Sequence, residues 1–514
     1  MSTLKIIWRS VIVFLLVAYL VFGLQTPAIA QLSNPPNAAD GSIKPYLDRV
    51  KSKVTEFKLE NGMKFIVLER HEAPVVSFVT YADVGGVDEP EGKTGVAHFL
   101  EHLAFKGTSR IGTNNWQAEK VLLDKLDQLD MQIREAIAKG QDPKPLQAEF
   151  AQVEIQAGQY VKVNEYKKII DQAGGVELNA STGTDATQYY YSLPANKLEL
   201  WFSLESDRFL DPVFREFYKE KAVVLEEKRL RIDNSPTGKL FDAFQGKAFT
   251  SHPYKNPVIG YEDDLRSLTR KDVQEFFEKY YGPSNLTVGI VGDVDPRQVK
   301  RLAASYFGRY VAKPNALAVK AVEPTQTTAK NFTLELESQP VYMEGYHRPA
   351  INHPDNAVYA VIAKLMSDGR RSRLYDQLVD KQKIALSASG FNGYPGDKFP
   401  NLLVFFALPA PKVSLEKVEV ALRAEITKIQ QDPVTPEELE RVKRQFKVEV
   451  LDSLGFDLYI ASALVEAEVK LGSWRKLFEG LDQVDAVTAA DIQRVARATF
   501  TEANRTVGKL ITKN

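Results

Sequence analysis

The chain has 514 residues, which is too long for one hydrophobic core and predicts at least two domains. Its hydrophobic share of 44% and charged share of 26% are those of an ordinary globular protein. Lysine and arginine number 66 against 67 acidic residues, with no long basic run, so we expect no nucleic-acid partner. The chain contains no cysteine, so any metal site must use histidine, aspartate or glutamate.

Residues 1–30 have the pattern of a secretory signal peptide. Lys5 and Arg9 provide a positive start, residues 11–24 are almost entirely apolar, and small residues at 26–30 form a cleavage site. The apolar stretch is short for a membrane-spanning helix, which needs about 20 residues, although an uncleaved anchor is the alternative. No second apolar run is long enough to cross a bilayer. We therefore expect a periplasmic or secreted protein with no stable membrane span after signal removal.

The next elements alternate between strands and helices. Residues 31–50 are rich in proline, asparagine and serine and read as a loose lead-in. Apolar and β-branched residues at 64–68 and 75–81 predict two strands. Apolar residues at helical spacing within 92–107 predict a helix that stops at Gly107.

A helical hairpin is predicted at about 120–165. Apolar residues recur at spacings of three and four on both arms, and a glycine–proline break separates the arms. The stripes consist of Leu122, Leu126, Leu129 and Ile133 on the first arm and Phe150, Val153 and Ile155 on the second. We interpret the hairpin as a structural insertion, since such stripes usually serve packing.

An internal repeat indicates two related domains. Residues 269–289 align without gaps on 488–508, and both copies read as a threonine-capped helix, an asparagine turn and a strand. We therefore predict an α+β fold of two tandem homologous domains, at 51–312 and 331–514, joined by a linker at 313–330. Each domain should contain a mixed or antiparallel sheet with helices packed on one face, and the first also carries the hairpin.

The residues that carry chemistry are His98, Glu101 and His102. On a helix, positions i and i+4 lie on one face, so both imidazoles can bind one ion. Zinc with imidazole and carboxylate ligands keeps an open position for water, whose pKa falls to about 7. Glu101 lies on the same face and can take the proton of that water, as in the H-x-x-E-H pattern of zinc peptidases.

A third ligand should come from another segment. The best candidate is the carboxylate-rich helical stretch at 220–227, in which Glu220 and Glu227 share a face while Glu226 points away. Without the two histidines, this run would be read as a solvated helix face.

In these motifs the chain resembles the pitrilysin-type metallopeptidases, which include insulin-degrading enzymes and the mitochondrial processing peptidase. The likeness covers residues 50–512. It is carried by His98-Phe99-Leu100-Glu101-His102, by Phe105-Lys106-Gly107-Thr108, by Gly174-Gly175 with Asn179-Ala180-Ser181-Thr182, and by the 220–227 run.

The resemblance implies a role for each matching residue. Glu227 would be the third ligand of a single zinc ion, and Glu220 would be a carboxylate that supports the site. Asn179 and Ala180 would lie on an edge strand whose backbone pairs with an extended peptide substrate. The chain would then be a zinc-dependent endopeptidase acting on peptides or unfolded segments, with Glu101 as general base.

One departure from the family concerns substrate binding. Family members often carry an arginine and a tyrosine in the second domain, where they hold substrate and the oxyanion, but Val379 and Leu386 stand at those positions. Neither side chain can donate a hydrogen bond. We expect a homodimer or a heterodimer with a related subunit, and in the heterodimer the related subunit would supply the missing pair. The alternative is a catalytically weak or inactive subunit of an envelope complex.

Overall fold

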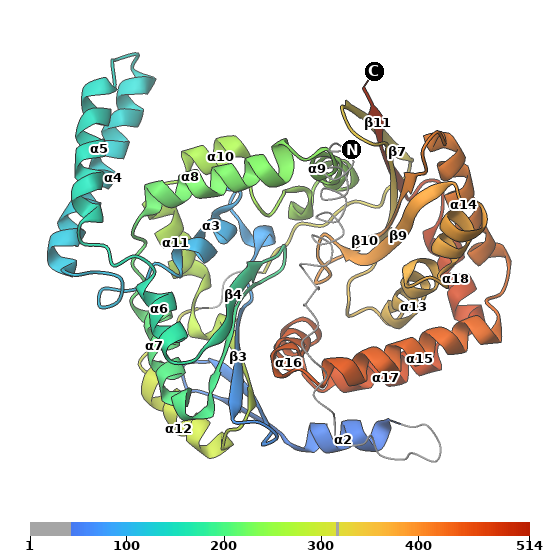
Figure 1. The fold of residues 1–514 in the computed structure, drawn as a ribbon, viewed down its shortest axis with the longest axis horizontal. Helices are drawn as coiled ribbons and strands as arrows, with labels where there is room; N and C mark the ends of the chain where they lie inside the picture. Colours follow the sequence, from blue (N-terminus) through green and yellow to red (C-terminus); the bar gives the residue numbers. More distant parts are fainter. Residues whose placement is uncertain (1–42, 315–317, 514) are drawn as a thin grey trace, which may run out of the picture. The chain divides into compact units, whose positions relative to one another are not determined.

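A computed structural model describes residues 43–314 and 318–513 of the chain (Figure 1). The predicted signal peptide and most of the predicted lead-in lie outside these described residues. The first described helix is α2 (Lys44–Ser52), and the chain from Leu47 onward forms one compact unit. Among the described helices, none combines the length and the apolar character needed to cross a membrane.

The first domain is built on a sheet of six strands. The strands are β1 (Val54–Lys58), β2 (Lys64–Glu69), β3 (Val75–Ala82), β4 (Val176–Thr182), β5 (Thr187–Pro194) and β6 (Leu286–Gly292). Their order is β1-β2-β6-β3-β5-β4, and every neighbouring pair is antiparallel except β2 and β6. The two strands predicted at 64–68 and 75–81 are β2 and β3.

The second domain repeats this sheet with one strand fewer. Its strands are β7 (Lys330–Leu336), β8 (Val341–Arg348), β9 (Ala385–Tyr394), β10 (Asn401–Pro409) and β11 (Arg505–Thr512). Their order is β7-β11-β8-β10-β9, again with one parallel pair, β7 and β11. Without β1, the two sheets have the same order and the same strand directions, which confirms the predicted α+β fold of two homologous domains.

The sequence repeat corresponds to one helix–strand unit in each domain. Thr269 caps α11 (Arg270–Tyr280) ahead of β6, and Thr488 caps α18 (Ala489–Thr499) ahead of β11, each with a reciprocal aspartate bond. After each helix, the side-chain amide of Asn285 or Asn504 donates to the carbonyl of the last helical residue. The repeated residues therefore form the same cap and the same turn twice.

Helices surround both sheets. In the first domain they are α3 (Val96–Leu103), α4 (Trp116–Ala138), α5 (Lys144–Gly158), α6 (Glu165–Gln172), α7 (Leu198–Leu210), α8 (Phe217–Lys228), α9 (Pro236–Ala248), α10 (Glu262–Ser267), α11 and α12 (Pro296–Phe307). In the second they are α13 (Asn356–Ser367), α14 (Leu415–Gln431), α15 (Pro436–Ser453), α16 (Asp457–Leu471), α17 (Lys476–Ala486) and α18.

Each domain lends a helix to the other domain's sheet. In the first sheet, α7 packs on one face, where Phe78 stacks on Trp201 at 4.6 Å between ring centroids, and α16 from the second domain packs along β3 and β6. A Cβ atom on Gly289 of β6 would lie 2.7 Å from the carbonyl oxygen of Ala461 in α16. Only glycine permits so close an approach of the helix.

The second sheet is covered in the same reciprocal way. Its own helices α13, α14 and α18 pack against Tyr342 and Phe405, while α9 from the first domain packs against Met343 and Val404. These residues alternate along β8 and β10, as expected for strands buried on both faces. The predicted helices on one face of each sheet are therefore the domain's own helices. The helix that each sheet receives from the other domain, α16 or α9, was not predicted.

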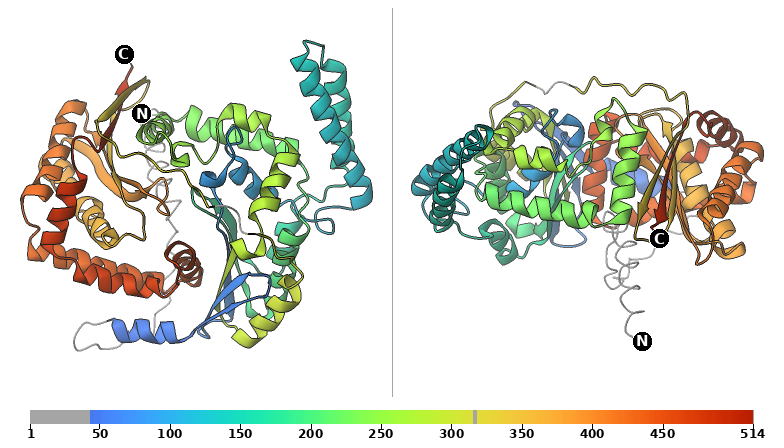
Figure 2. Two further views of the ribbon diagram at one scale, coloured as in Figure 1. Left: turned by 180° about the vertical axis from the view of Figure 1, so that it is seen from behind. Right: turned by 90° about the horizontal axis from the view of Figure 1, so that it is seen from above.

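The predicted hairpin is formed by α4 and α5, which extend away from the rest of the first domain (Figures 1 and 2). Leu126, Leu129 and Val153 are buried in its seam, as predicted. The predicted burial of Ile155 is wrong, because this side chain is 68% exposed on the outer face of α5. On α4, Leu123 is buried more fully than the expected Leu122, which lies at the edge of the seam.

Candidate metal centre

Helix α3 places the three residues of the motif. It begins after Gly95, whose φ of 87° is left-handed and suits glycine. The Glu89 carboxylate accepts hydrogen bonds from the backbone N–H groups of Gly95 and Ala97, both at 2.9 Å. A carboxylate at a helix N-terminus satisfies free N–H groups and complements the helix dipole. The start of the motif helix is thus held by a side chain outside the motif.

The two histidines converge on one carboxylate of α8. His98 Nε2 lies 3.8 Å from Glu227 Oε1, and His102 Nε2 lies 3.4 Å from Glu227 Oε2. One ligand atom from each of the three residues can be chosen so that all lie within 4.8 Å of one another. Two residues from α3 and one from α8 therefore form a single cluster.

The chemistry of this cluster fits zinc. Two imidazoles and one carboxylate form a ligand set of catalytic zinc sites, which leaves a fourth position open. Burial and the neighbouring His102 lower the pKa of His98 to about 4. His98 Nδ1 is buried without a hydrogen-bond partner among the described residues, and the Nε2 atom faces the cluster.

Glu220 lies behind His102, on the side away from Glu227. His102 Nδ1 is 3.0 Å from Glu220 Oε1, and Lys106 Nζ is 2.6 Å from Glu220 Oε2. Burial of His102 opposes its charge, but hydrogen bonds to Glu220 and Glu227 outweigh burial and raise its pKa to about 9. Burial would raise the pKa of Glu220, but bonds from His102 and Lys106 lower it overall. Glu220 thus orients the imidazole, as carboxylates do around metal-binding histidines.

Glu101 lies on the same helix and is held from the edge of the first sheet. Its Oε2 accepts a hydrogen bond of 2.7 Å from the hydroxyl of Thr182, the last residue of β4. Burial raises the pKa of Glu101, and the Thr182 bond partly opposes that rise. A carboxylate with a raised pKa, directly before His102 in the chain, is suited to accept and then return a proton.

Asn179 and Ala180 lie on β4, as the resemblance implies. In the sheet, β4 pairs only with β5, so its other edge has no strand beside it in the described chain. The Asn179 side chain is exposed, and its Oδ1 accepts from the N–H of Ala180 at 2.9 Å. Because the same strand ends at Thr182, the free edge runs towards the residue that bonds Glu101.

The sequence motifs assign no individual role to three residues that contact this site. Thr182 and Lys106 fall within stretches that carry the resemblance, and Arg231 lies outside them. Arg231 Nη1 is 2.8 Å from Glu227 Oε1, and Arg231 follows Glu227 by four residues in the chain. A basic residue one helical turn after an expected ligand is a signal that could have identified it.

The two positions that depart from the family pattern lie in the second domain. Val379 belongs to the π-helical turn η6 (Tyr375–Lys381) and packs at the edge of the second core, while Leu386 lies on β9 and is 52% exposed. Neither offers a donor for a substrate carbonyl.

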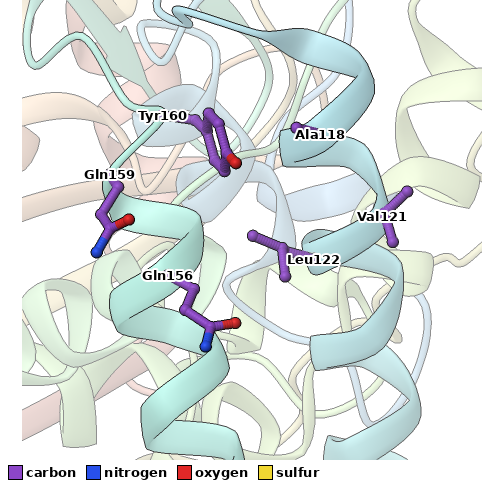
Figure 3. Close-up of a pocket in the computed structure, with 6 residues that line it drawn as sticks. All are labelled: Ala118, Val121, Leu122, Gln156, Gln159 and Tyr160. Atoms are coloured by element: carbon purple, nitrogen blue, oxygen red, sulfur yellow. The ribbon is translucent and has the colours of Figure 1, made fainter.

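A surface groove lies elsewhere, between the two arms of the hairpin (Figure 3). None of the residues predicted for the site lines it. Its lining consists of Ala118, Val121, Leu122, Gln156, Gln159 and Tyr160.

Comparison with protein families gives two matches along the chain. The family described as Insulinase (Peptidase family M16) matches residues 65–121 and 156–262. The family described as Peptidase M16 inactive domain matches residues 267–446. The interruption of the first match falls within the α4–α5 hairpin, and the two matched segments contain α3 and α8.

Curated relatives align with most of the chain. The zinc protease PqqE of Helicobacter pylori is 28% identical over 461 residues, which cover 87% of this chain and 90% of that protein. An uncharacterized zinc protease, YmxG of Bacillus subtilis, is 21% identical over 87% of this chain and 96% of its own length.

Solved structures share the fold. The crystal structure of a protease from Helicobacter pylori has a TM-score of 0.76 and 26% identity, covering 90% of this chain and 99% of that one. A structure described as a peptidase M16 inactive domain from Pseudomonas fluorescens has a TM-score of 0.72 at 14% identity, covering 90% of this chain and 98% of that one. The two M16 family descriptions match consecutive segments of this chain, and relatives align with most of its length. This protein therefore belongs to the pitrilysin or insulinase family of metallopeptidases, peptidase family M16.

Proposed function

We propose that this chain is a zinc-dependent endopeptidase that hydrolyses peptides or unfolded polypeptide segments. His98, His102 and Glu227 would hold one zinc ion per chain. The observation that carries the proposal is the convergence of both imidazole Nε2 atoms on the Glu227 carboxylate, beside a partly buried Glu101. The names of relatives such as PqqE support zinc and proteolysis in the same family.

Glu101 is the general base of this proposal. Bound zinc would polarise the substrate carbonyl and make the attacking water more acidic. Glu101 takes a proton from that water and passes it to the departing amine. Burial raises the pKa of Glu101, which makes it a better proton acceptor, and the hydroxyl of Thr182 keeps the carboxylate oriented.

The free edge of β4 would bind the substrate backbone. An extended peptide can add to a sheet edge through main-chain hydrogen bonds, which select for an extended conformation more than for sequence. Asn179 and Ala180 lie on that edge, and the strand leads to Thr182 and Glu101. This arrangement favours unfolded or peptide substrates over folded proteins.

We infer a bacterial envelope location and a dimeric assembly. The sequence at 1–30 supports export to the periplasm or the medium, and one relative of the same fold is described as the periplasmic protease PqqL of Escherichia coli. The dimer would be formed with an identical or a related subunit. Only a related subunit could supply the arginine and the tyrosine that Val379 and Leu386 replace here.

A second candidate function follows from the same two positions. Val379 and Leu386 favour a weak or inactive subunit of an envelope complex, or the zinc half of a heterodimer. The family match at 267–446, described as an inactive domain, is compatible with this alternative. Retention of His98, Glu101 and His102 argues against an inactive subunit.

The deciding experiment compares the wild type with Glu101→Gln. The variant should keep about one zinc per chain and its thermal stability, because no proposed ligand changes, but lose at least about 100-fold in the rate of peptide cleavage. His102→Ala and Glu227→Ala should lose the zinc itself. Metal content by mass spectrometry and cleavage of an unstructured peptide provide the two readouts. Cleavage by Glu101→Gln at the wild-type rate would rule out this mechanism.

A further inference from the structure

Two cations of the described chain contact the carboxylates of the metal centre. Lys106 contacts Glu220 and also Glu216, at 2.6 and 3.4 Å, and its side chain is 19% exposed. Arg231 contacts Glu227 and is 70% exposed. Lys106 is thus committed to two carboxylates, whereas Arg231 remains open to the solvent from which substrate arrives.

The local backbone directs Arg231 towards the site. Helix α8 continues into the π-helical turn η3 (Arg229–Asp233), and π-helical turns are often found at functional sites. An ion pair of 2.7 Å between Lys228 and Asp233 spans the turn. A Cβ atom on Gly238 of α9 would lie 2.2 Å from the carbonyl oxygen of Arg231, so the next helix begins directly against this backbone. The backbone of the turn is therefore fixed against α9 at Arg231, although its side chains face solvent.

The guanidinium has donors to spare. Arginine carries five N–H donors in a planar fork, and the contact with Glu227 Oε1 uses Nη1. The same carboxylate oxygen faces His98 Nε2 at 3.8 Å, so Arg231 and His98 approach one atom of the cluster. A cation in this place can donate to an oxygen that binds beside the ligands.

We propose that Arg231 is a catalytic residue that donates a hydrogen bond to the oxygen of the scissile carbonyl as negative charge develops there. This inference rests on the proposed peptidase function. It assigns to the first domain of this chain the donor that Val379 and Leu386 fail to supply from the second domain.

Arg229 provides a matched control. It belongs to the same turn, carries the same charge and makes a similar ion pair, with its Nε donating to Glu226 Oε2 at 2.7 Å. Glu226, however, is exposed and lies outside the metal centre. Both variants therefore remove one positive charge. Arg231→Ala removes it beside the metal centre, and Arg229→Ala removes it at a solvent-exposed ion pair.

The test measures three quantities on the zinc-loaded full-length chain. The first is cleavage of an unstructured peptide, for which Arg231→Ala should lower kcat by about 100-fold while Arg229→Ala changes it less than about twofold. Arg231→Lys should recover part of the loss, since it keeps a donor with positive charge. The second is affinity for a phosphinic peptide, whose tetrahedral anion imitates the developing charge. This affinity should fall at least about tenfold in Arg231→Ala.

Zinc content is the third quantity and separates catalysis from positioning. We expect Arg231→Ala to keep about one zinc per chain, because all three proposed ligands remain. Loss of zinc in parallel with activity would overturn the proposal and make Arg231 a residue that only orients Glu227. Equal kcat and equal phosphinic-peptide affinity in the two arginine variants would also overturn it. If the wild type fails to cleave peptide, the proposed function fails, while the phosphinic-peptide comparison still decides whether Arg231 binds an oxyanion.

Discussion

Glu344 is an ionisable side chain without any exposed surface, placed in the middle of β8. The hydroxyls of Tyr342 and Tyr346 donate to its carboxylate at 2.6 and 3.2 Å, and Arg423 Nε approaches at 3.3 Å. Burial raises the pKa of Glu344, and the bond from Tyr342 only partly opposes this effect. The second domain therefore contains an acid whose titration is linked to folding.

We expect this acid to make stability depend on pH. In the unfolded chain its pKa is near 4.5, and in the folded protein it is higher. As pH rises above about 4.5, the unfolded chain releases the proton while the folded protein retains it, so the free energy of unfolding falls until the folded group also ionises. Glu344→Gln removes this dependence.

Urea unfolding of both proteins between pH 4 and pH 8 checks the prediction. The stability of the wild type should fall relative to Glu344→Gln as pH rises. A difference that stays constant across this range would show that Glu344 keeps the same protonation state when the chain unfolds.

At the residue scale, the sequence identified the cluster only in part. The spacing of His98 and His102 predicts a shared helix face from geometry alone. Glu227 was one of several carboxylates in its run, and only the resemblance singled it out. Thr182 joins the site through tertiary approach, at the end of a strand far from Glu101 in the sequence, which no local pattern specifies. Arg231 follows Glu227 by four residues, so its contact with the site is local and could have been expected from the spacing. The roles assigned to the clustered residues stay predictions until the variants are measured.

At the scale of elements, Arg215 ties together the two ligand-bearing segments and the hairpin. This side chain is buried just ahead of α8, and it bonds Glu119 of α4 at 2.9 Å. Its remaining donors reach the carbonyls of Lys106, Thr108 and Ile111, in the loop that follows α3. One guanidinium thus satisfies three carbonyls and one carboxylate in the interior.

We expect the loss of this guanidinium to be costly. Arg215→Met leaves the Glu119 carboxylate buried without its partner, and breaking a buried pair from one side costs about 3–5 kcal/mol of unfolding free energy. Arg266→Ala is the surface control, because Arg266 is 61% exposed and pairs with an exposed glutamate, so its change should stay within about 1 kcal/mol. Denaturant unfolding measures both. Similar small losses in the two variants would show that the interior pair contributes no more than a surface pair.

The hairpin shows how far periodicity predicts an element. Spacings of three and four residues gave both arms and the seam between them, because two packed helices need an apolar stripe. The same pattern misassigned Ile155, which lies next to the stripe on α5 and faces solvent. The polar contacts that fix the hairpin's direction, such as the bonds of Arg270 to Asp124 and Asp127, join segments far apart in sequence and could not be predicted.

At the scale of the whole molecule, the repeat predicted two similar domains but not their exchange of helices. A repeat predicts the helices and strands that each copy forms by itself. The helix that covers the second face of each sheet comes from the other copy. Gly289 and Gly508 are equivalent in the repeat, and each lies where the borrowed helix approaches its strand. In the sequence they appear only as glycines inside strands.

The exchange predicts that the domains are unstable apart. A fragment of residues 43–312 lacks α16, so the apolar face of its sheet along β3 and β6 is left without cover. We expect this fragment to be insoluble or to bind a hydrophobic dye when produced alone, and to become soluble when produced together with residues 318–513. Soluble yield and copurification of the two fragments are the measurements. A monomeric first fragment with a cooperative unfolding transition would contradict the expectation.

The order in which the exchanged helices are synthesised constrains how the protein matures. By the time β6 leaves the ribosome, every strand of the first sheet exists, yet its cover, α16, still awaits translation of most of the second domain. The apolar face of the first sheet, along β3 and β6, is consequently exposed in the nascent chain until α16 has been synthesised. Chaperones that recognise exposed apolar strands could bind this face during that time. A chain truncated before residue 457 lacks α16 and would stay bound to them.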